Sequence, residues 1–124
     1  MGATILVIED EPMMREVLAS TLTTAGYNVI TAANGEEGML TLHVMQPDLI
    51  ICDRSMPKMS GYEFLNHIRT SFPNYNSMPF IFLTALSDMR DRKAVDHLGP
   101  AAYLSKPFEY GVLLDTVKKN LMKT

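Results

Sequence analysis

The sequence lacks tryptophan, has a single cysteine and contains no long hydrophobic run. Because Cys52 stands alone, the chain cannot form an internal disulfide bond. A membrane-spanning helix needs about 18 or more apolar residues in succession, and neither such a stretch nor a signal-peptide pattern is found. These absences predict a chain that does not insert into a membrane and that resides in the reducing cytoplasm.

Basic residues are also few and scattered. The chain has 11 Lys and Arg residues against 14 Asp and Glu residues, which gives a formal net charge of −3. A protein that binds nucleic acid directly usually gathers its Lys and Arg into a stripe or patch that neutralises phosphates. The charge pattern therefore predicts no direct contact with nucleic acid.

What the sequence does contain is a regular alternation of short apolar runs and longer segments with helical spacing. The apolar runs predict strands at residues 4–8, 27–32, 49–52, 80–83 and 101–104. Helices are predicted at about 13–25, 34–45 and 62–70, from Ser87 or Asp88 to Gly99, and after Pro107. At 124 residues, we expect a single α/β domain over 1–124, with an open parallel sheet covered by helices on both faces.

The buried face of the last helix is assigned from spacing. Tyr110, Leu114, Val117 and Leu121 recur at intervals of three and four residues, which places them on one side of a helix. We expect that side to pack against the sheet.

Charged and polar side chains follow the predicted strands at the points where they end. Glu9-Asp10-Glu11 follows the first strand, Asp53 the third, Thr84 the fourth and Lys106 the fifth. The carboxyl ends of parallel strands lie at one edge of the sheet, where ligands of such folds bind. Carboxylates from two neighbouring strands form an oxygen-rich site that suits Mg²⁺, so the sequence predicts a magnesium site at this edge.

Asp53 differs from the other acids because it follows the most hydrophobic strand and precedes a loop. A carboxylate in this position can act as a nucleophile toward phosphorus and form an acyl phosphate. The ammonium group of Lys106 and the hydroxyl of Thr84 could then hold phosphoryl oxygens. An alternative for the acidic cluster is a solvated loop in which Asp10 and Glu11 cap the first helix.

This constellation closely resembles the receiver domain of two-component response regulators. The shared features are the acidic pair, the lone Asp53, Thr84 with a small residue after it, Lys106-Pro107, and the loop DRSMPKMSGYEFL. The resemblance implies a flavodoxin-like (βα)5 fold of five parallel strands in the order 2-1-3-4-5. It also implies a phosphoacceptor signalling domain, which is not an enzyme in the usual sense because it is consumed in each cycle.

The resemblance further assigns a role to each site residue. It implies that Asp53 is the phosphoacceptor, and that Glu9, Asp10 and the backbone carbonyl of Ser55 bind Mg²⁺ together with Asp53. The remaining assignments are Thr84 and Lys106 at the phosphoryl oxygens, Tyr103 as an aromatic switch that follows Thr84, and a cis bond before Pro107.

The implied reaction is phosphoryl transfer to Asp53 from a histidine kinase or a histidine phosphotransfer protein, followed by hydrolysis. Movement of Thr84 and Tyr103 would change the surface formed by the fourth helix, the fifth strand and the fifth helix. That surface would control a downstream effector or an attached output domain, and it could form a homodimer. One departure from the family pattern is Ser60, where many receivers carry Asp.

An alternative keeps the fold and removes the chemistry. A receiver-like domain could serve as a protein-interaction or dimerisation module without phosphorylation. The presence of Asp53, Thr84 and Lys106 argues against this reading and leaves it open.

Overall fold

The computed structural model describes residues 2–72, 78–85 and 102–122. The strands are β1 (Thr4–Ile8), β2 (Asn28–Ala32), β3 (Leu49–Asp53), β4 (Phe80–Ala85) and β5 (Ala102–Lys106). The helices are α1 (Pro12–Thr24), α2 (Gly35–Val44), α3 (Gly61–Ser71) and α5 (Tyr110–Leu121). The helix predicted from Ser87 or Asp88 to Gly99 lies outside the described residues.

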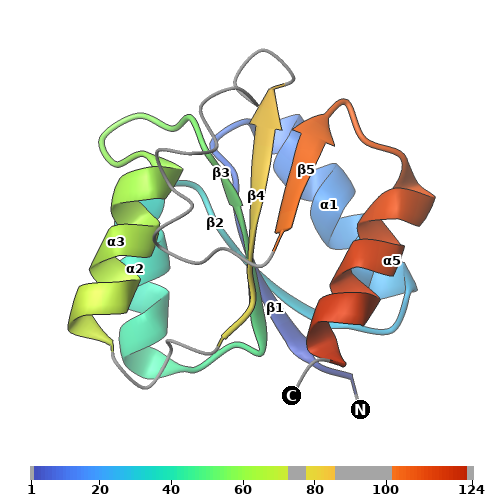
Figure 1. Ribbon diagram of the computed structural model, residues 1–124, viewed down its shortest axis with the longest axis horizontal. Helices are drawn as coiled ribbons and strands as arrows, with labels where there is room; N and C mark the ends of the chain where they lie inside the picture. The colour runs from blue at the N-terminus through green and yellow to red at the C-terminus, as the bar shows by residue number, and fades with distance from the viewer. Residues whose placement is uncertain (1, 73–77, 86–101, 123–124) are drawn as a thin grey trace.

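The five strands form one parallel sheet in the order β2-β1-β3-β4-β5, which confirms the predicted fold class and strand order. Helices α2 and α3 lie on one side of the sheet, and α1 and α5 lie on the other (Figure 1). The molecule therefore has three layers, as expected for repeated βα units with right-handed crossovers.

Successive side chains of each strand point to opposite faces of the sheet and build two separate cores. The side chains of Leu6, Ile8, Ile50 and Cys52 pack with α2 and α3; we call this the α2/α3 face. The alternate residues pack with α1 and α5 on what we call the α1/α5 face: Ile5, Val7, Leu49, Ile51, Ile81, Leu83 and Leu104. Burial of β1 and β3 on both faces explains their continuous apolar sequences.

The prediction for the buried face of α5 was wrong at Tyr110. Its side chain is 58% exposed, whereas Leu113, which was not assigned to the inner face, is fully buried with Val117. Leu114 and Leu121 pack against the same core from partly exposed positions. The buried residues of α5 are Leu113, Val117 and Asn120, so the inner side of the helix is rotated away from Tyr110, and apolar spacing alone did not fix this rotation.

Polar residues fix the start of three helices. The Glu11 carboxylate accepts hydrogen bonds from the backbone N–H groups of Met13 (3.2 Å) and Met14 (2.7 Å) at the start of α1. The Asn34 side chain caps α2, and Ser60 caps α3 in a capping box with Glu63. The capping alternative for the acidic cluster thus applies to Glu11, which leaves Glu9 and Asp10 for the site.

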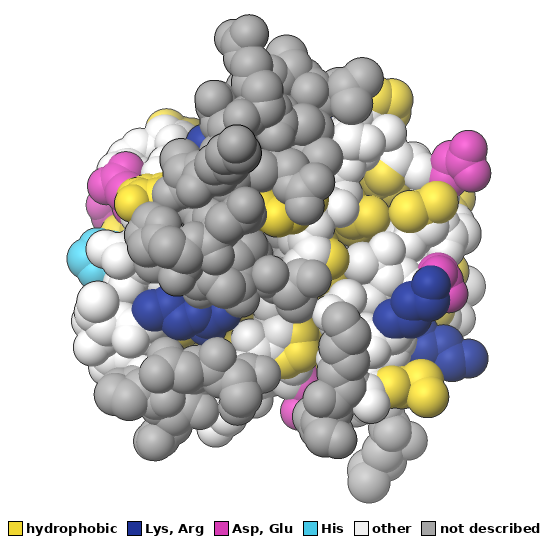
Figure 2. Space-filling model, in the orientation of Figure 1, with side chains coloured by type: hydrophobic (Ala, Val, Ile, Leu, Met, Phe, Trp, Pro, Cys, Tyr) yellow, Lys and Arg dark blue, Asp and Glu magenta, His cyan; other side chains and the backbone are white. Residues whose placement is uncertain are grey.

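Among the described residues, the Lys and Arg side chains visible in Figure 2 form separate groups. Within the described ranges, no helix has the length and apolar character required to cross a bilayer.

Candidate functional site

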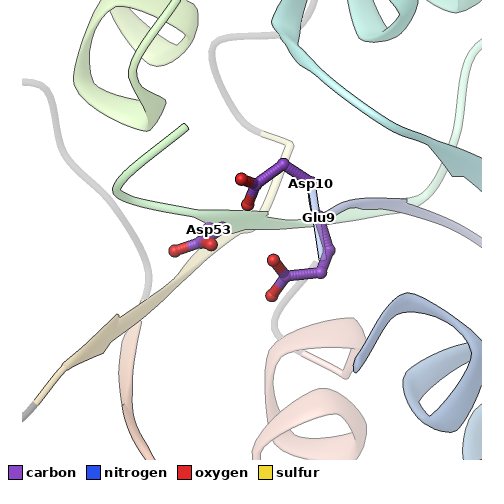
Figure 3. A group of neighbouring side chains, drawn as sticks. All are labelled: Glu9, Asp10 and Asp53. Carbon is purple, nitrogen blue, oxygen red and sulfur yellow. The ribbon is translucent and has the colours of Figure 1, made fainter. Parts of the chain in front are cut away.

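Three carboxylates meet at the carboxyl ends of β1 and β3. One oxygen from each of Glu9, Asp10 and Asp53 lies within 4.8 Å of the others. Glu9 and Asp53 continue the alternation of the α1/α5 face, whereas Asp10 continues that of the α2/α3 face. Figure 3 shows the consequence, with the Glu9 and Asp10 side chains leaving the end of β1 on opposite sides.

Lys106 joins two of these carboxylates from the end of β5. Its Nζ atom lies 2.9 Å from Glu9 Oε1 and 3.0 Å from Asp53 Oδ2. Glu9 is fully buried and Asp53 is 5% exposed, so both charges need a nearby partner. The three side chains share the α1/α5 face because each lies two residues past a core residue of that face: Val7, Ile51 and Leu104.

Burial and charge shift the pKa values of this cluster. Burial, together with the neighbouring Asp53, raises the pKa of Glu9 to about 7, although Lys106 acts in the opposite direction. Burial tends to lower the pKa of Lys106, but its hydrogen bonds to Glu9 and Asp53 outweigh this effect and raise it. Lys106 therefore stays protonated, and the Glu9 carboxylate would be stabilised by a cation at this edge.

Backbone and side-chain donors orient the two buried acids. The N–H of Ser55 donates to Asp53 Oδ1 at 3.2 Å, and the N–H of Glu11 donates to Glu9 Oε2 at 3.2 Å. Arg15 reaches back from α1 to donate to the Glu9 carbonyl at 2.8 Å. Sequence reasoning missed the role of Arg15; its spacing of six residues from Glu9, one helical turn into α1, was the available signal.

The loop after Asp53 is tightly closed. The N–H of Arg54 donates to the Leu83 carbonyl at 2.8 Å, and the N–H of Gly61 donates to the Arg54 carbonyl at 2.9 Å. A Cβ atom on Gly61 would lie 2.5 Å from the Asp53 carbonyl oxygen. Only glycine allows this approach, which holds the backbone of Asp53 and Arg54 in place.

Thr84 and Tyr103 follow the alternation of the α2/α3 face, unlike Lys106. Thr84 is buried at the end of β4, and its hydroxyl donates to the Ala85 carbonyl at 3.3 Å. The Tyr103 ring stacks on Phe82, with ring centroids 5.8 Å apart and an interplanar angle of 24°.

The structure thus gathers Glu9, Asp10, Asp53 and Lys106 into one cluster, with Thr84 at the neighbouring strand end. The Lys106–Pro107 peptide bond is cis.

The donor set fits the predicted cation. Mg²⁺ binds hard oxygen ligands, usually one or two carboxylates with several waters and substrate phosphates. Glu9, Asp10 and Asp53 supply only carboxylate oxygens, and no Cys or His of the described ranges belongs to this group. Cys52 is fully buried, which raises the pKa of its thiol and makes it a packing residue of the α2/α3 face.

This geometry agrees with a family assignment. Residues 5–118 match the response regulator receiver domain family. The chain belongs to that family. The match covers all of the strands except Thr4, and most of α5, so the receiver domain assignment made from the sequence is confirmed, and with it a role in signalling rather than in classical enzymatic turnover.

Individual relatives agree with the receiver domain assignment. A protein of Guillardia theta named "Probable transcriptional regulator ycf27" is 37% identical over 120 residues, covering 97% of this chain and 46% of its own length. The receiver domain thus spans about half the length of the curated relatives it matches. The chemotaxis response regulator CheY4 of Vibrio cholerae has a TM-score of 0.90 and 32% identity, covering 97% of this chain and 99% of its own.

A third relative bears on the metal. The receiver domain of the sensor histidine kinase PA1611 from Pseudomonas aeruginosa has a TM-score of 0.88 and 30% identity, covering 98% of both chains. Its structure is described as having a magnesium ion coordinated in the active site cleft.

The departure from the family pattern at Ser60 is explained by helix capping, because serine caps α3 in this receiver domain as aspartate would.

Proposed function

We propose that this receiver domain accepts a phosphoryl group on Asp53 from a phosphohistidine donor and thereby changes its affinity for an effector protein or an attached output domain. The donor would be a histidine kinase or a histidine phosphotransfer protein. Residues 1–124 would act as one receiver unit. The cytoplasmic location stays a prediction.

The observation that carries this proposal is the position of Asp53. A nearly buried carboxylate would normally avoid two neighbouring acids, yet Asp53 shares Lys106 with Glu9 at 3.0 and 2.9 Å. A structural ion pair needs one acid and one base, whereas this cluster, counted over the residues that the structure describes, holds acids in excess. Excess negative charge at a strand edge is the arrangement expected of a site that binds a cation and a reacting group.

In the proposed reaction, an Asp53 carboxylate oxygen attacks the phosphorus of phosphohistidine. A P–O bond to Asp53 forms as the P–N bond breaks, and the imidazole leaves with the electron pair of that bond and takes up a proton. Lys106 holds Asp53 in place and offers its N–H groups to the transferred oxygens, and Thr84 lies at the next strand end for the same purpose. Glu9, Asp10, Asp53 and the Ser55 carbonyl would hold Mg²⁺, which when bound neutralises phosphoryl charge.

The proposed output runs through β5. Tyr103 stacks on Phe82, which lies two residues before Thr84 in β4. A shift of Thr84 toward a phosphoryl group would therefore alter the packing beside Tyr103. β5 and α5 would carry the change to a partner or to a second copy of the receiver. The third part of the predicted surface, the helix after Ser87 or Asp88, falls outside the described residues.

The test is the intact mass of the protein after incubation with Mg²⁺ and acetyl phosphate. We expect one phosphoryl adduct that requires Mg²⁺ and is absent from Asp53→Asn. Purified phosphorylated histidine kinases and phosphotransfer proteins, offered in turn, would test the proposed donor class. If no donor phosphorylates the wild type, and Asp53→Asn leaves partner binding unchanged, the domain acts as an interaction module instead.

A further inference from the structure

A pocket opens beside the carboxylate cluster, on the α2/α3 side of the sheet edge. Its wall includes Asp10 of the cluster and continues along the loop after β3 to the start of α3. The residues that line it are Asp10, Arg54, Ser55, Met56, Pro57, Ser60 and Tyr62. This pocket is therefore continuous with the site but is built mostly from residues that the proposed transfer does not use.

Arg54 supplies the cationic group of this pocket. Cys52 faces α2 and α3, so the alternation of β3 carries Arg54 to the same side as Asp10. The backbone of Arg54 is fixed by hydrogen bonds on both sides, at 2.8 Å to Leu83 and 2.9 Å from Gly61. A guanidinium group on a fixed backbone, in a pocket that Ser55 and Ser60 also line, is suited to binding a phosphate-like anion.

The charge at the sheet edge shows why such a residue matters. Among the described residues of the cluster, three carboxylates face the ammonium group of Lys106. A bound Mg²⁺ would roughly neutralise this excess, and a phosphodonor with two negative charges would then meet little net attraction. Arg54 adds positive charge on the open side of the cluster, where a small molecule can enter.

We propose that Arg54 is a substrate-binding residue that selects small phosphodonors by charge, favouring dianionic acyl phosphates. This inference rests on the proposed function, because the donor reacts at Asp53. In the step, an Asp53 oxygen forms a bond to phosphorus, the P–O bond to the acyl group breaks, and the acyl group leaves as a carboxylate with the bonding electrons. Arg54 binds the donor through its charge and takes no part in bond making.

The test measures binding separately from transfer. Acetylphosphonate is a dianion like acetyl phosphate, but its phosphorus is bonded to carbon, so its phosphoryl group cannot be transferred to Asp53. Its dissociation constant would be measured by NMR titration in the presence of Mg²⁺ for the wild type, Arg54→Gln and Lys58→Gln. Lys58 is the matched control, because it is an exposed cation of the same loop that does not line the pocket.

We expect Arg54→Gln to weaken acetylphosphonate binding about fivefold, since one partly exposed charge contact is worth roughly 1 kcal/mol. Lys58→Gln should change it less than about twofold, and the monoanionic methyl ester of acetylphosphonate should depend less on Arg54. Equal effects of the two variants, or no binding to the wild type, would overturn the inference. Thermal melts of each variant would show whether folding is retained.

Phosphorylation by acetyl phosphate separates this inference from the proposed function. If the wild type is phosphorylated on Asp53 but Arg54→Gln binds acetylphosphonate normally, the selection by Arg54 is wrong and the function stands. If acetylphosphonate binding depends on Arg54 but no donor phosphorylates Asp53, the function is wrong and the anion site stands.

Discussion

The two faces of the sheet end differently at its carboxyl edge. On the α1/α5 face, Glu9, Asp53 and Lys106 form a closed and largely buried cluster with short ion pairs. On the α2/α3 face, Asp10 is partly exposed and borders an open pocket with Arg54 and Ser55. The same alternation of strand residues that builds two cores thus separates a fixed set of charges from an accessible one.

This difference suggests a division of labour. Groups that must hold an exact position benefit from burial, because their hydrogen bonds are stronger there and water cannot displace them. Groups that meet a ligand need access, and the loop on the α2/α3 face provides it. The predictions below test this division, beginning with the closed side.

Removing the cation of the closed cluster should have the largest effect. In Lys106→Met, we expect phosphorylation of Asp53 to slow about a hundredfold, because a charged donor aimed at the developing charge is lost. Mg²⁺ binding should become tighter, since Lys106 Nζ no longer occupies Glu9 Oε1 and Asp53 Oδ2. Intact-mass kinetics and a Mg²⁺ titration would measure the two opposite changes.

Lys119→Met is the matched control for that substitution. Lys119 pairs with Asp115 at 3.1 Å on the exposed surface of α5, where ion pairs contribute little. Both the rate and the Mg²⁺ affinity should stay at wild-type values. A comparable loss of rate in Lys119→Met would mean that overall charge, and not the position of Lys106, controls the reaction.

Packing on the α2/α3 face can be tested with a pair of glycines. A Cβ on Gly38 would lie 2.7 Å from Ile8 Cδ1 and 3.0 Å from Phe64 Cε1, whereas one on Gly111 of α5 would meet nothing within 4 Å. We expect Gly38→Ala to lower the free energy of unfolding by about 1 to 2 kcal/mol through overpacking. Gly111→Ala should raise it by about 0.5 kcal/mol, because alanine favours the helix. Urea denaturation of both variants would measure the contrast, and a loss of stability in both would contradict it.

The directions of the side chains at the sheet edge could be predicted from the sequence, because the alternation of side chains along a strand is a local property. The run from Thr4 to Ile8 fixes the opposite directions of Glu9 and Asp10 without knowledge of any other element. The ion pairs of Lys106 could not be predicted this way, because 97 and 53 residues separate it from its partners. Their existence depends on the order and register of β1, β3, β4 and β5, of which the family resemblance supplied the order.

Helix orientation and loop geometry were predicted less well. Spacing placed Tyr110 inside and omitted Leu113, because the buried side of α5 is centred between Leu113 and Val117 and is rotated away from Tyr110. Pro57 to Met59 forms a tight turn centred on Lys58, which has a φ of 69°. Lysine gives no signal for this left-handed conformation, which glycine and asparagine usually adopt.

A buried amide offers a smaller test on the α1/α5 face. Asn120 is 5% exposed; its Nδ2 donates to the Thr116 carbonyl at 2.8 Å, but across the described part of the chain its Oδ1 has no partner. An unsatisfied buried acceptor costs free energy, so Asn120→Leu should raise the free energy of unfolding by about 1 kcal/mol. Asn120→Asp, which places a charge there, should lower it. A stability loss in Asn120→Leu, measured by thermal denaturation, would show that Oδ1 is satisfied in solution.

A difference of similar size is expected in the loop of the α2/α3 face. The N–H of Met59 donates to the Pro57 carbonyl at 2.7 Å, which closes a three-residue turn around Lys58 and forces its positive φ. Alanine retains the steric cost of this conformation and glycine removes it, so Lys58→Gly should be more stable than Lys58→Ala by about 1 kcal/mol. Because both variants lose the same charge, the difference between their urea midpoints reports the backbone alone. Equal midpoints would mean that the turn relaxes without cost, and the loop that carries Arg54 and Ser55 would then be less firmly fixed than the closed cluster beside it.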